Sequence, residues 1–413
     1  MKSVGIVVEY NPLHNGHLYH LNESKKAANA DCVIAVMSGQ FLQRGEPAIV
    51  PKNIRTKMAL QAGADLVIEL PYAFSAQHAT YFAKGAVSIL HSLECSALCF
   101  GSEDGDINRF TKFLDHKKRQ QSLIDQEVKQ MIAQGMSYPT AYSKALSQVI
   151  GLQDEFDITR PNNILGIQYI EAIDYFKSSI KPLTIKRIAA DYHDETIDHT
   201  SIASATAIRK VLSTTNQELY NQYVPSSTSL ELNNYLQTTK LFHSWEAYFH
   251  LLKYKCLTAS AYELNNIYEA VEGLELRVLQ KIKQASSFEQ LMNEVKTKRY
   301  TWTRIQRLLT HILTNTSKDQ MSEYLNDGHV LYIRLLGMTE KGKEYIRLKK
   351  KNLSIPIYHN VNQQNQHDLL LDVKATNTYA SVLSSGLQND LMKTEFSQYP
   401  ILYQSTSKSF LKV

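Results

Sequence analysis

Cysteine, long apolar runs and net charge are all scarce in this chain of 413 residues. Its four cysteines (Cys32, Cys95, Cys99 and Cys256) are too few and too scattered for a disulfide framework or a paired zinc site, so we expect core thiols. No apolar run approaches the roughly 18–20 residues that a membrane span needs, and the N-terminal apolar stretch is too short for a signal peptide. These absences predict a soluble, cytoplasmic protein with no membrane partner.

The remaining composition is that of an ordinary globular protein. Hydrophobic residues make up 43% of the chain and charged residues 21%, which excludes disorder and low-complexity filaments. The 45 basic and 40 acidic residues leave a formal charge of +5, too small by itself to indicate an anionic partner.

The N-terminal half alternates short apolar runs with helical patterns. The runs span residues 4–9, 32–37, 66–69 and 97–100, with a further candidate at 183–187, and the helical patterns span 16–28, 54–62 and 79–93. Strands separated by single helices predict an α/β fold with a doubly wound, Rossmann-like parallel sheet, in which ligands bind beyond the carboxyl ends of the strands.

The chain divides into an N-terminal domain over residues 1–215, a polar linker over 216–240 and a mainly helical, basic region over 241–413. In that region Ile305, Leu308, Leu309, Ile312 and Leu313 form an apolar stripe at helical spacing. Residues 354–358 are a strand candidate there. The second half therefore predicts a separate, largely helical unit.

The strongest chemical signal is Glu-Tyr-Asn-Pro-Leu-His-Asn-Gly-His-Leu over residues 9–18. A buried strand ends in a turn, and a helix opens with His14, Gly16 and His17. Free N–H groups and the dipole at a helix start favour phosphate, and two histidines three residues apart can face one anion. Read alone, these histidines are equally well surface residues, but the strand, turn and helix around them favour a phosphate site.

This segment resembles the nucleotide-binding signature of the HIGH-type nucleotidyltransferase superfamily, whose members cleave ATP between the α- and β-phosphates. A second superfamily element is a Ser/Thr-rich helix start that ends in arginine, and residues 201–209 resemble it. There Ser204 and Thr206 can cap a helix and offer hydroxyl groups to phosphate, with Arg209 one turn later. Such a cap is commonplace by itself and gains weight only beside the histidine motif.

Three longer runs narrow the resemblance to one bacterial family. Residues 7–20, 37–48 and 63–71 resemble the tRNA(Met) cytidine acetate ligase family, which uses ATP and acetate to acetylate the wobble cytidine of elongator methionine tRNA. The likeness covers residues 1 to 210 well, and 300–309 and 334–343 more loosely. It implies ATP and Mg²⁺ as cofactors and elongator tRNA(Met) and acetate as partners, and leaves the oligomeric state open.

The resemblance also implies a set of ATP contacts, and it assigns the catalysis to His14, His17 and Arg209. Gly101 follows a strand where a side chain would block base or ribose, Asn162 can bond a base edge, and Arg187 can reach a phosphate. Without the family, Gly101 is a turn glycine and Asn162 a helix cap. The full set is Val7, Val8, Glu9, Tyr10, Asn11, Pro12, Leu13, His14, Asn15, Gly16, His17, Leu18, Tyr19, His20, Gly101, Asn162, Arg187, Ile188, Ser204 and Thr206.

Residues 37–40 follow the second strand, and the loop that they begin should face the same site. With Gln43, Arg44, Lys52 and Arg55 nearby in sequence it can hold acetate or pyrophosphate, although surface charges have the same appearance. Glu69, at the end of the third strand, is either structural or a Mg²⁺ ligand.

The implied chemistry has two steps. Acetate attacks the α-phosphate, giving acetyl-adenylate and pyrophosphate, while His14, His17, Arg187, Arg209 and Mg²⁺ stabilise charge. The cytidine N4 amine then attacks the activated carbonyl and releases AMP, which requires the base to leave its stack.

RNA binding should leave a basic surface. We expect RNA contacts from two basic clusters, over residues 281–319 and 341–351. In the first cluster, Arg304, Arg307 and His311 form a basic stripe on one helix. Tyr300 and Trp302 there can stack on unpaired bases. Solvated helix faces have the same composition. The predicted RNA contacts are Lys298, Arg299, Arg304, Arg307, Lys349 and Lys350.

Two other functions fit part of the sequence. A coenzyme adenylyltransferase needs only the first half of the chain and leaves residues 244–413 unexplained. A non-catalytic RNA-binding protein with a relic nucleotide fold is disfavoured by the presence of both histidines and the Ser/Thr–Arg element.

Overall fold

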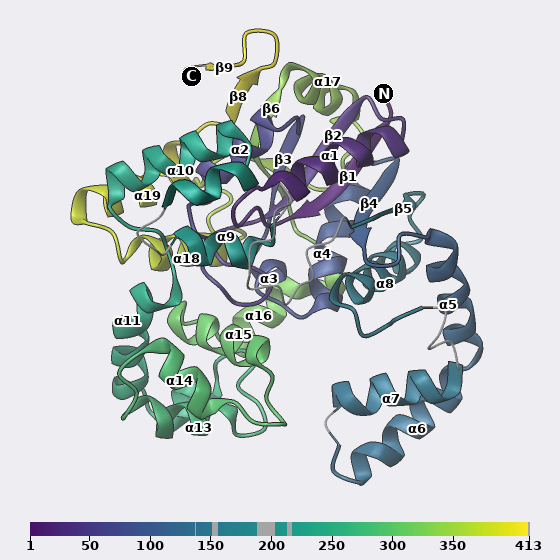
Figure 1. Ribbon diagram of the computed structural model, residues 1–413. Coiled ribbons are helices and arrows are strands. Elements are labelled where there is room, and N and C mark those ends of the chain that lie inside the picture. The colour runs from purple at the N-terminus through teal and green to yellow at the C-terminus, as the bar shows by residue number, and fades with distance from the viewer. Residues whose placement is uncertain (137, 151–155, 188–202, 213–216, 412–413) are drawn as a thin grey trace.

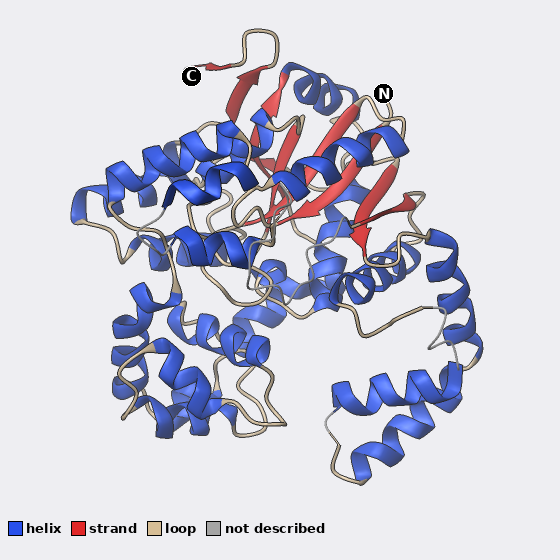
Figure 2. Ribbon diagram, in the orientation of Figure 1, coloured by secondary structure: helices blue, strands red, loops and turns tan. Residues whose placement is uncertain are grey.

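A computed structural model describes residues 1–136, 138–150, 156–187, 203–212 and 217–411. Helices surround a single sheet, and a helical unit and a helical hairpin extend from it (Figures 1 and 2). Within the described ranges the strands are β1 (Ser3–Val8), β2 (Cys32–Ser38), β3 (Leu66–Leu70), β4 (Ala97–Ser102), β5 (Lys181–Lys186), β6 (Ile333–Thr339), β7 (Ile357–Tyr358), β8 (Ile401–Gln404) and β9 (Ser409–Leu411).

The helices of the N-terminal half alternate with these strands. They are α1 (Asn15–Ala27), α2 (Lys52–Gln61), α3 (Tyr72–Ser75), α4 (Ala79–Ser92), α5 (Ile107–Arg119), α6 (Gln121–Ala133), α7 (Tyr138–Ile150), α8 (Pro161–Tyr175) and α9 (Ala205–Leu212). After α9 come a 3₁₀ helix (Gln217–Tyr223) and α10 (Ser226–Thr239).

The helices of the C-terminal half fall into two groups. The helical unit contains α11 (Trp245–Thr258), α12 (Ala261–Asn265), α13 (Leu274–Ile282), α14 (Phe288–Val295), α15 (Trp302–Leu313) and α16 (Lys318–Leu325). The chain then passes through a short 3₁₀ helix (Asn326–Gly328) back to the sheet with α17 (Glu340–Lys349), α18 (Leu370–Ala380) and α19 (Ser385–Ser397).

The sheet order is β5-β4-β1-β2-β3-β6-β8-β9, with β7 also paired to β6. The pairs among β1 to β5 are parallel, which confirms the predicted doubly wound core. Successive residues of β2 enter different hydrophobic clusters, Ile34 and Val36 on one face and Val33, Ala35 and Met37 on the other. A strand covered on both faces reads as a continuous apolar run, which is why the sequence revealed it.

The C-terminal part differs from the predicted helical region. β6 pairs antiparallel with β3, so that Val67 lies opposite Gly337 and Glu69 opposite Arg334. β8 and β9 then extend the same sheet. Residues 333–411 therefore complete the N-terminal sheet, and only residues 245–325 form the separate helical unit that the sequence predicts for the whole of 241–413.

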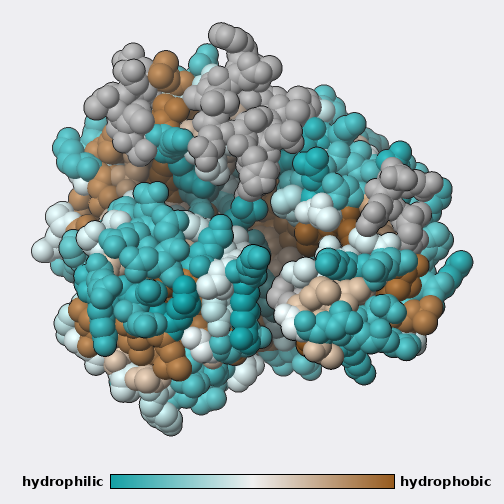
Figure 3. Space-filling model, turned by 60° about the horizontal axis from the view of Figure 1, so that its bottom comes forward, coloured by the Kyte–Doolittle hydropathy of each residue, from teal (hydrophilic) through white to brown (hydrophobic). Residues whose placement is uncertain are grey.

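All four cysteines are free and buried, as expected. Among the described residues, no helix is both long and apolar enough to cross a membrane. Figure 3, seen from the lower end of Figure 1, shows a hollow between the surface over the helical unit and the surface over α6 and α7.

Candidate active site

The turn between β1 and α1 is fixed by buried contacts. The Asn11 side chain accepts a hydrogen bond of 2.7 Å from the backbone of the loop after β2, and Arg55 donates to the Glu9 carbonyl oxygen at 2.8 Å. Tyr10 adopts a left-handed φ of 51°, which is rare for a bulky residue. The turn thereby delivers His14 to the start of α1.

His14 and His17 lie side by side at that helix start. The Nδ1 atom of His14 accepts a hydrogen bond of 3.1 Å from the backbone of Gly16, so His14 is the N-cap of α1. The His17 ring stacks on the His14 ring with centroids 3.8 Å apart, and its Nδ1 accepts from the His14 backbone at 3.4 Å. A neutral imidazole that accepts at Nδ1 carries its proton on Nε2. Both rings therefore offer an Nε2–H donor.

Three imidazoles of this site are neutral near pH 7. Burial, together with the nearby Arg187 guanidinium, lowers the pKa of His14 to about 3 and that of His20 to about 4. Burial and the neighbouring His14 hold the pKa of His17 well below its ordinary value. The histidines thus act as neutral hydrogen-bond donors, and the positive charge of the site comes from arginine.

Two buried polar atoms of the site lack a partner. Among the described residues, neither the Tyr10 hydroxyl nor Nε2 of His20 makes a hydrogen bond. The Tyr10 ring meets the His17 ring edge to face, with centroids 5.2 Å apart. An unsatisfied buried polar atom costs about 1–3 kcal/mol, so both atoms suit a polar ligand that bonds to them.

The Ser/Thr–Arg element reaches the same turn from α9. Ser204 caps the helix by accepting a 3.1 Å hydrogen bond from the Ala207 backbone. Arg209 donates to the Asn11 carbonyl oxygen at 3.0 Å and to the Thr206 hydroxyl at 3.4 Å. The fold therefore brings the two sequence elements together, although about 190 residues separate them in the chain.

Gly101 and Arg187 lie side by side on β4 and just beyond the neighbouring parallel strand β5. Gly101 is inside β4 rather than after it, and Arg187 directly follows β5. A Cβ atom on Gly101 would lie 3.4 Å from Cγ of Arg187 and 3.7 Å from Cδ2 of His20. The three residues thus line one place beside the histidines. Ile188, predicted to contact ATP, lies outside the described residues.

Asn162 lies in the first turn of α8, where it contacts the end of β4. Its Nδ2 donates to Oε1 of Glu103 at 2.6 Å, and its backbone donates to the same oxygen. Glu103 also accepts from the Asn163 backbone, so this carboxylate caps α8. Glu103 was not singled out from the sequence, because a lone carboxylate directly after a strand gives little signal.

A polar cluster surrounds the Glu9 carboxylate at the end of β1. Oε1 of Glu9 accepts a 2.7 Å hydrogen bond from the Gln43 backbone. Glu46 forms an ion pair of 3.3 Å with Arg209. Burial raises the pKa of Glu9, partly offset by the Gln43 hydrogen bond and by the charges of Arg44 and Arg209. The Gln-Arg-Gly-Glu segment after β2 therefore does face the site.

Two cations predicted to hold acetate or pyrophosphate are instead buried in the scaffold. Arg55 is fully buried and donates to backbone oxygens of Ser38, Gly39 and Val50. Lys52 forms ion pairs with Glu69 at 2.8 Å and with Glu395 at 2.5 Å. Neither is free to bind a substrate anion, because their donors are already bonded.

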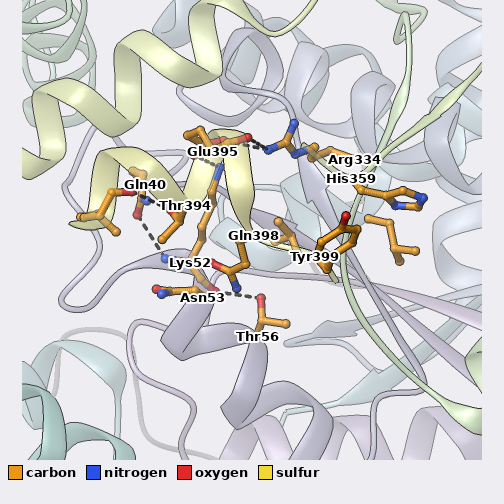
Figure 4. A pocket seen from close by; sticks show the side chains of 13 residues that line it. Gln40, Lys52, Asn53, Thr56, Arg334, His359, Thr394, Glu395, Gln398 and Tyr399 are labelled. Atoms are coloured by element: carbon orange, nitrogen blue, oxygen red, sulfur yellow. Dashed lines mark hydrogen bonds and ion pairs between the residues drawn. The ribbon is translucent and has the colours of Figure 1, made fainter. Parts of the chain in front are cut away.

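Glu69 is structural, which resolves the choice left by the sequence. It lies in a buried ionic cluster with Lys52, Glu395 and Arg334, and Arg334 contacts Glu395 at 2.9 Å. This cluster borders a pocket between α2, β6 and α19 (Figure 4). Burial raises the pKa of Glu69 to about 7, opposed by the Lys52 charge.

No protein cage for a metal ion is present among the described residues, where no group of three or more His, Cys, Asp or Glu side chains converges. Mg²⁺ commonly binds through one or two carboxylates together with substrate phosphates. A Mg²⁺ ion at this site would therefore have to take most of its ligands from the nucleotide and from water.

The predicted RNA contacts divide by exposure. Lys298, Arg299 and Lys350 are exposed, and Arg299 and Arg304 both pair with Glu272. Arg307 and Lys349 are more buried and also pair with acids, Arg307 with Glu269 at 2.7 Å and Lys349 with Glu94 at 2.6 Å.

Two aromatic or basic groups expected on that surface are in fact internal. His311 is fully buried, with Nδ1 2.9 Å from the Tyr72 hydroxyl, so it is not part of a basic stripe. Tyr300 is 7% exposed and donates its hydroxyl hydrogen to the Glu272 carbonyl oxygen, so it is not a stacking platform. Helical spacing alone did not distinguish the apolar face of α15 from its edge.

Comparison with known proteins identifies the family of this chain. A family model described as "HIGH Nucleotidyl Transferase" matches residues 1–394. A protein named tRNA(Met) cytidine acetate ligase from Halalkalibacterium halodurans is 50% identical over 404 residues, which cover 97% of each chain. The protein of the same name from Bacillus subtilis is 45% identical over the full length of both chains.

A solved structure shows the same architecture. Thermotoga maritima TmcAL bound with alpha-thio ATP has a TM-score of 0.89 and 32% sequence identity, covering 98% of this chain and 100% of that one. The apo structure of the same protein has a TM-score of 0.90.

Proposed function

The chain belongs to the HIGH nucleotidyl transferase family and, within it, to the tRNA(Met) cytidine acetate ligases, and on this premise we propose that it acetylates N4 of the wobble cytidine of elongator tRNA(Met). The substrates are ATP, acetate and the tRNA, and the products are AMP, pyrophosphate and the acetylated tRNA.

The stacked pair of His14 and His17 carries this proposal. Their Nε2–H donors lie at the N-terminus of α1, where backbone N–H groups and the helix dipole also favour phosphate. Arg187 and Arg209 approach from β5 and α9 and supply the positive charge. Neutral donors and two forked cations around one helix start suit a polyphosphate better than a single carboxylate.

In the first step an acetate oxygen attacks the α-phosphorus of ATP, and the bond to the β-phosphate oxygen breaks. Negative charge grows on the α-phosphate and on the leaving pyrophosphate. His14 and His17 are placed to donate hydrogen bonds to the α-phosphate, and Arg187 and Arg209 to stabilise the leaving group. Bound Mg²⁺ would neutralise phosphate charge.

In the second step the N4 amine of cytidine attacks the carbonyl carbon of acetyl-adenylate, and AMP leaves. A carboxylate cannot be attacked by so weak a nucleophile, so the mixed anhydride is needed. The hollow of Figure 3 is open to an anticodon loop whose base has left its stack. We assign the phosphate contacts of that loop to Lys298, Arg299 and Arg304 of the helical unit. Lys350 follows α17, whose Lys349 pairs with Glu94 before the amino end of β4, so it lies away from this hollow (Figure 1). ATP and tRNA are both cytoplasmic, so we assign the enzyme to the cytoplasm.

The decisive experiment is mass analysis of elongator methionine tRNA after incubation with the protein, ATP and acetate. We expect a mass gain of one acetyl group on the wobble cytidine, and none without acetate. No gain with the wild-type protein would refute the function. Adenylyl transfer to a small phosphorylated acceptor, independent of acetate, would favour a coenzyme adenylyltransferase instead.

The first step can be tested separately through acetate-dependent exchange between ATP and pyrophosphate. His17→Ala removes one Nε2–H donor, and loss of a charge-stabilising donor costs about 10²–10³-fold in rate. His116→Ala, which changes an exposed histidine on α5, is the matched control and should retain exchange. Normal exchange in His17→Ala would remove the histidine pair from the mechanism.

A further inference from the structure

The second step needs a proton acceptor, because the N4 amine loses a proton when it forms the new amide. The imidazoles of His14 and His17 are poor candidates. Each accepts a backbone N–H at Nδ1 and carries its own proton on Nε2, so neither nitrogen offers a free lone pair. Glu46, a carboxylate nearby, is held in an ion pair with Arg209.

Glu9 has the geometry that the proton acceptor requires. Its Oε1 is fixed by the Gln43 backbone at 2.7 Å. Its Oε2 makes no hydrogen bond or ion pair with any described residue, and it is not among the fully buried polar atoms that lack partners. One oxygen is therefore anchored while the other remains available to a substrate.

The electrostatic neighbours of Glu9 place it beside the adenylate site. Arg209 acts on the pKa of both Glu9 and His14, so one guanidinium lies near the carboxylate and the phosphate donors alike. The Glu9 charge also reaches Tyr169 on α8. Glu9 thus lies between α8 and the loop after β2, and the Gly45 carbonyl oxygen of that loop accepts hydrogen bonds from the helical unit.

We propose that Oε2 of Glu9 accepts a hydrogen bond from the cytosine N4 amine and takes its proton as the amide forms. A carboxylate is the usual acceptor for cytosine N4–H in proteins. As N4 bonds to the acetyl carbon, the carbonyl-to-phosphate oxygen bond breaks, AMP leaves with the electron pair, and the N4 proton passes to Glu9. This inference rests on the proposed function and adds a base and a specificity determinant to it.

The Gln43 contact makes Glu9→Gln an unusually informative change. The Gln43 backbone N–H can bond only to the amide oxygen, so the amide NH₂ must take the place of Oε2. That NH₂ group cannot accept a proton, and as a hydrogen-bond donor it cannot bond to the N4–H donors of cytosine. It can instead donate a hydrogen bond to O4 of uracil, which is an acceptor.

The test compares the two half-reactions in the full-length protein. Acetate-dependent exchange between ATP and pyrophosphate reports the first step, and single-turnover acetylation of elongator methionine tRNA from preformed acetyl-adenylate reports the second. For Glu9→Gln we expect transfer to fall by about 10²–10⁴-fold, the range for loss of a general base, and exchange to fall by less than about tenfold. Glu23→Gln makes the same charge change at a half-buried glutamate of α1 that pairs with the exposed Lys26, and it is the control.

Two further readouts separate proton transfer from mere support of the loop. The wild-type transfer rate should rise with pH through the titration of Glu9, which faces Arg44, Glu46 and Arg209, and this rise should vanish in Glu9→Gln. Glu9→Asp should keep the rise at a reduced rate. The second of these readouts is the affinity for a tRNA with uridine at the wobble position divided by the affinity for the cytidine tRNA. This ratio should be higher for Glu9→Gln than for the wild-type protein.

The proposal is overturned if Glu9→Gln transfers acetate at the wild-type rate, or if it loses exchange as fully as transfer. If Glu9→Gln does not fold, a Glu9→Asp profile with no pH-dependent rise overturns the proposal equally. Absence of acetylation by the wild-type protein would instead refute the proposed function, so the two failures are distinguishable.

Discussion

Histidine is an uncommon N-cap, since serine, threonine, aspartate and asparagine satisfy free helix N–H groups better. At position 14 the imidazole performs this task through Nδ1, and the cap thereby fixes the tautomer. The spacing of His14 and His17 predicts that both rings meet one anion. It does not predict that the rings stack, because stacking depends on the left-handed Tyr10 backbone and on burial by residues far along the chain.

Gly101→Ala should separate ligand binding from stability. The added Cβ meets only ordinary contacts, 3.4 Å from Arg187 and 3.7 Å from His20, so we expect the melting temperature to stay within a few degrees of wild type. The methyl group lies where we place the nucleotide, and we expect the KM for ATP to rise about tenfold, equivalent to about 1.4 kcal/mol of lost binding. An unchanged KM would exclude this place from the ATP site.

His243 offers a test of pH dependence away from the site. Its ring lies between the Tyr235 and Tyr248 hydroxyls, at 2.6 and 2.5 Å, and burial lowers its pKa from 6.5 to about 3. Below pH 6.5 the unfolded chain binds a proton that the folded chain refuses, so this group's contribution to stability falls as pH falls.

The stability difference between wild type and His243→Gln should therefore be largest above about pH 7 and narrow by about 1.4 kcal/mol per pH unit below the ordinary histidine pKa. Denaturant unfolding at several pH values measures it. A difference that is constant with pH would show that His243 titrates normally in the fold.

At the scale of elements, the loop between β2 and α2 connects the site to the helical unit. The Gly45 carbonyl oxygen accepts hydrogen bonds from the Trp245 indole at 2.9 Å and the Thr310 hydroxyl at 2.8 Å. The same loop bonds Glu9 through Gln43 and Arg209 through Glu46. A movement of the helical unit on RNA docking would therefore reach the nucleotide turn through this loop.

Gly45→Ala should break this connection. Gly45 has a φ of +75°, and a Cβ there would lie 2.5 Å from the Arg307 backbone nitrogen, which cannot move aside as a flexible side chain can. Gly135 has a similar φ of +88° with nothing near its Cβ, so Gly135→Ala is the control for backbone strain alone. We expect the free energy of unfolding to fall by about 1 kcal/mol in the control. In Gly45→Ala it should fall by several kcal/mol, because overpacking is added to the backbone strain. Equal losses of unfolding free energy, measured with denaturant, would show that the loop shifts to make room for the Cβ atom.

The elements differ in how far the sequence could predict them. β1 to β4 were found because strands covered on both faces form unbroken apolar runs, such as the one from Cys32 to Met37. β6 was missed because it contains a buried arginine and a glycine, Arg334 and Gly337, whose acceptable environments come from Glu395 and from packing against α2. Such partners lie far away in sequence, so no local pattern reveals them.

The site shows the same division between local and distant information. The helix start at His14 and the cap at Ser204 are local features, and both were readable from residue types. The burial of Lys52 and Arg55 could not be predicted, because the groups that bond to each come from distant parts of the chain. Their charge instead suggested a contact with the substrate.

At the scale of the whole molecule, the two ends of the chain build one sheet. β3 would be the sheet edge in residues 1–240, but β6 covers it, and Lys52 on α2 reaches Glu395 on α19. The ion pair of Lys52 with Glu69 is also completed by that C-terminal segment through Arg334 and Glu395. The N-terminal half is therefore stabilised by residues that follow the helical unit.

This topology predicts that residues 1–240 do not fold alone, although the sequence divides the chain there. The fragment would expose β3, whose five residues are apolar apart from Glu69, as an unpaired sheet edge, which favours aggregation. It would also leave the buried Lys52–Glu69 pair without its neighbours, and breaking a buried charge network costs about 3–5 kcal/mol, a large part of the roughly 5–15 kcal/mol that holds a domain together. Removal of residues 409–413 deletes only the outermost strand β9 and is the matched control. We expect the control to remain soluble with one cooperative thermal transition, and the fragment to aggregate. A monomeric, cooperatively melting fragment would show instead that the parallel core suffices and that β6 only covers it.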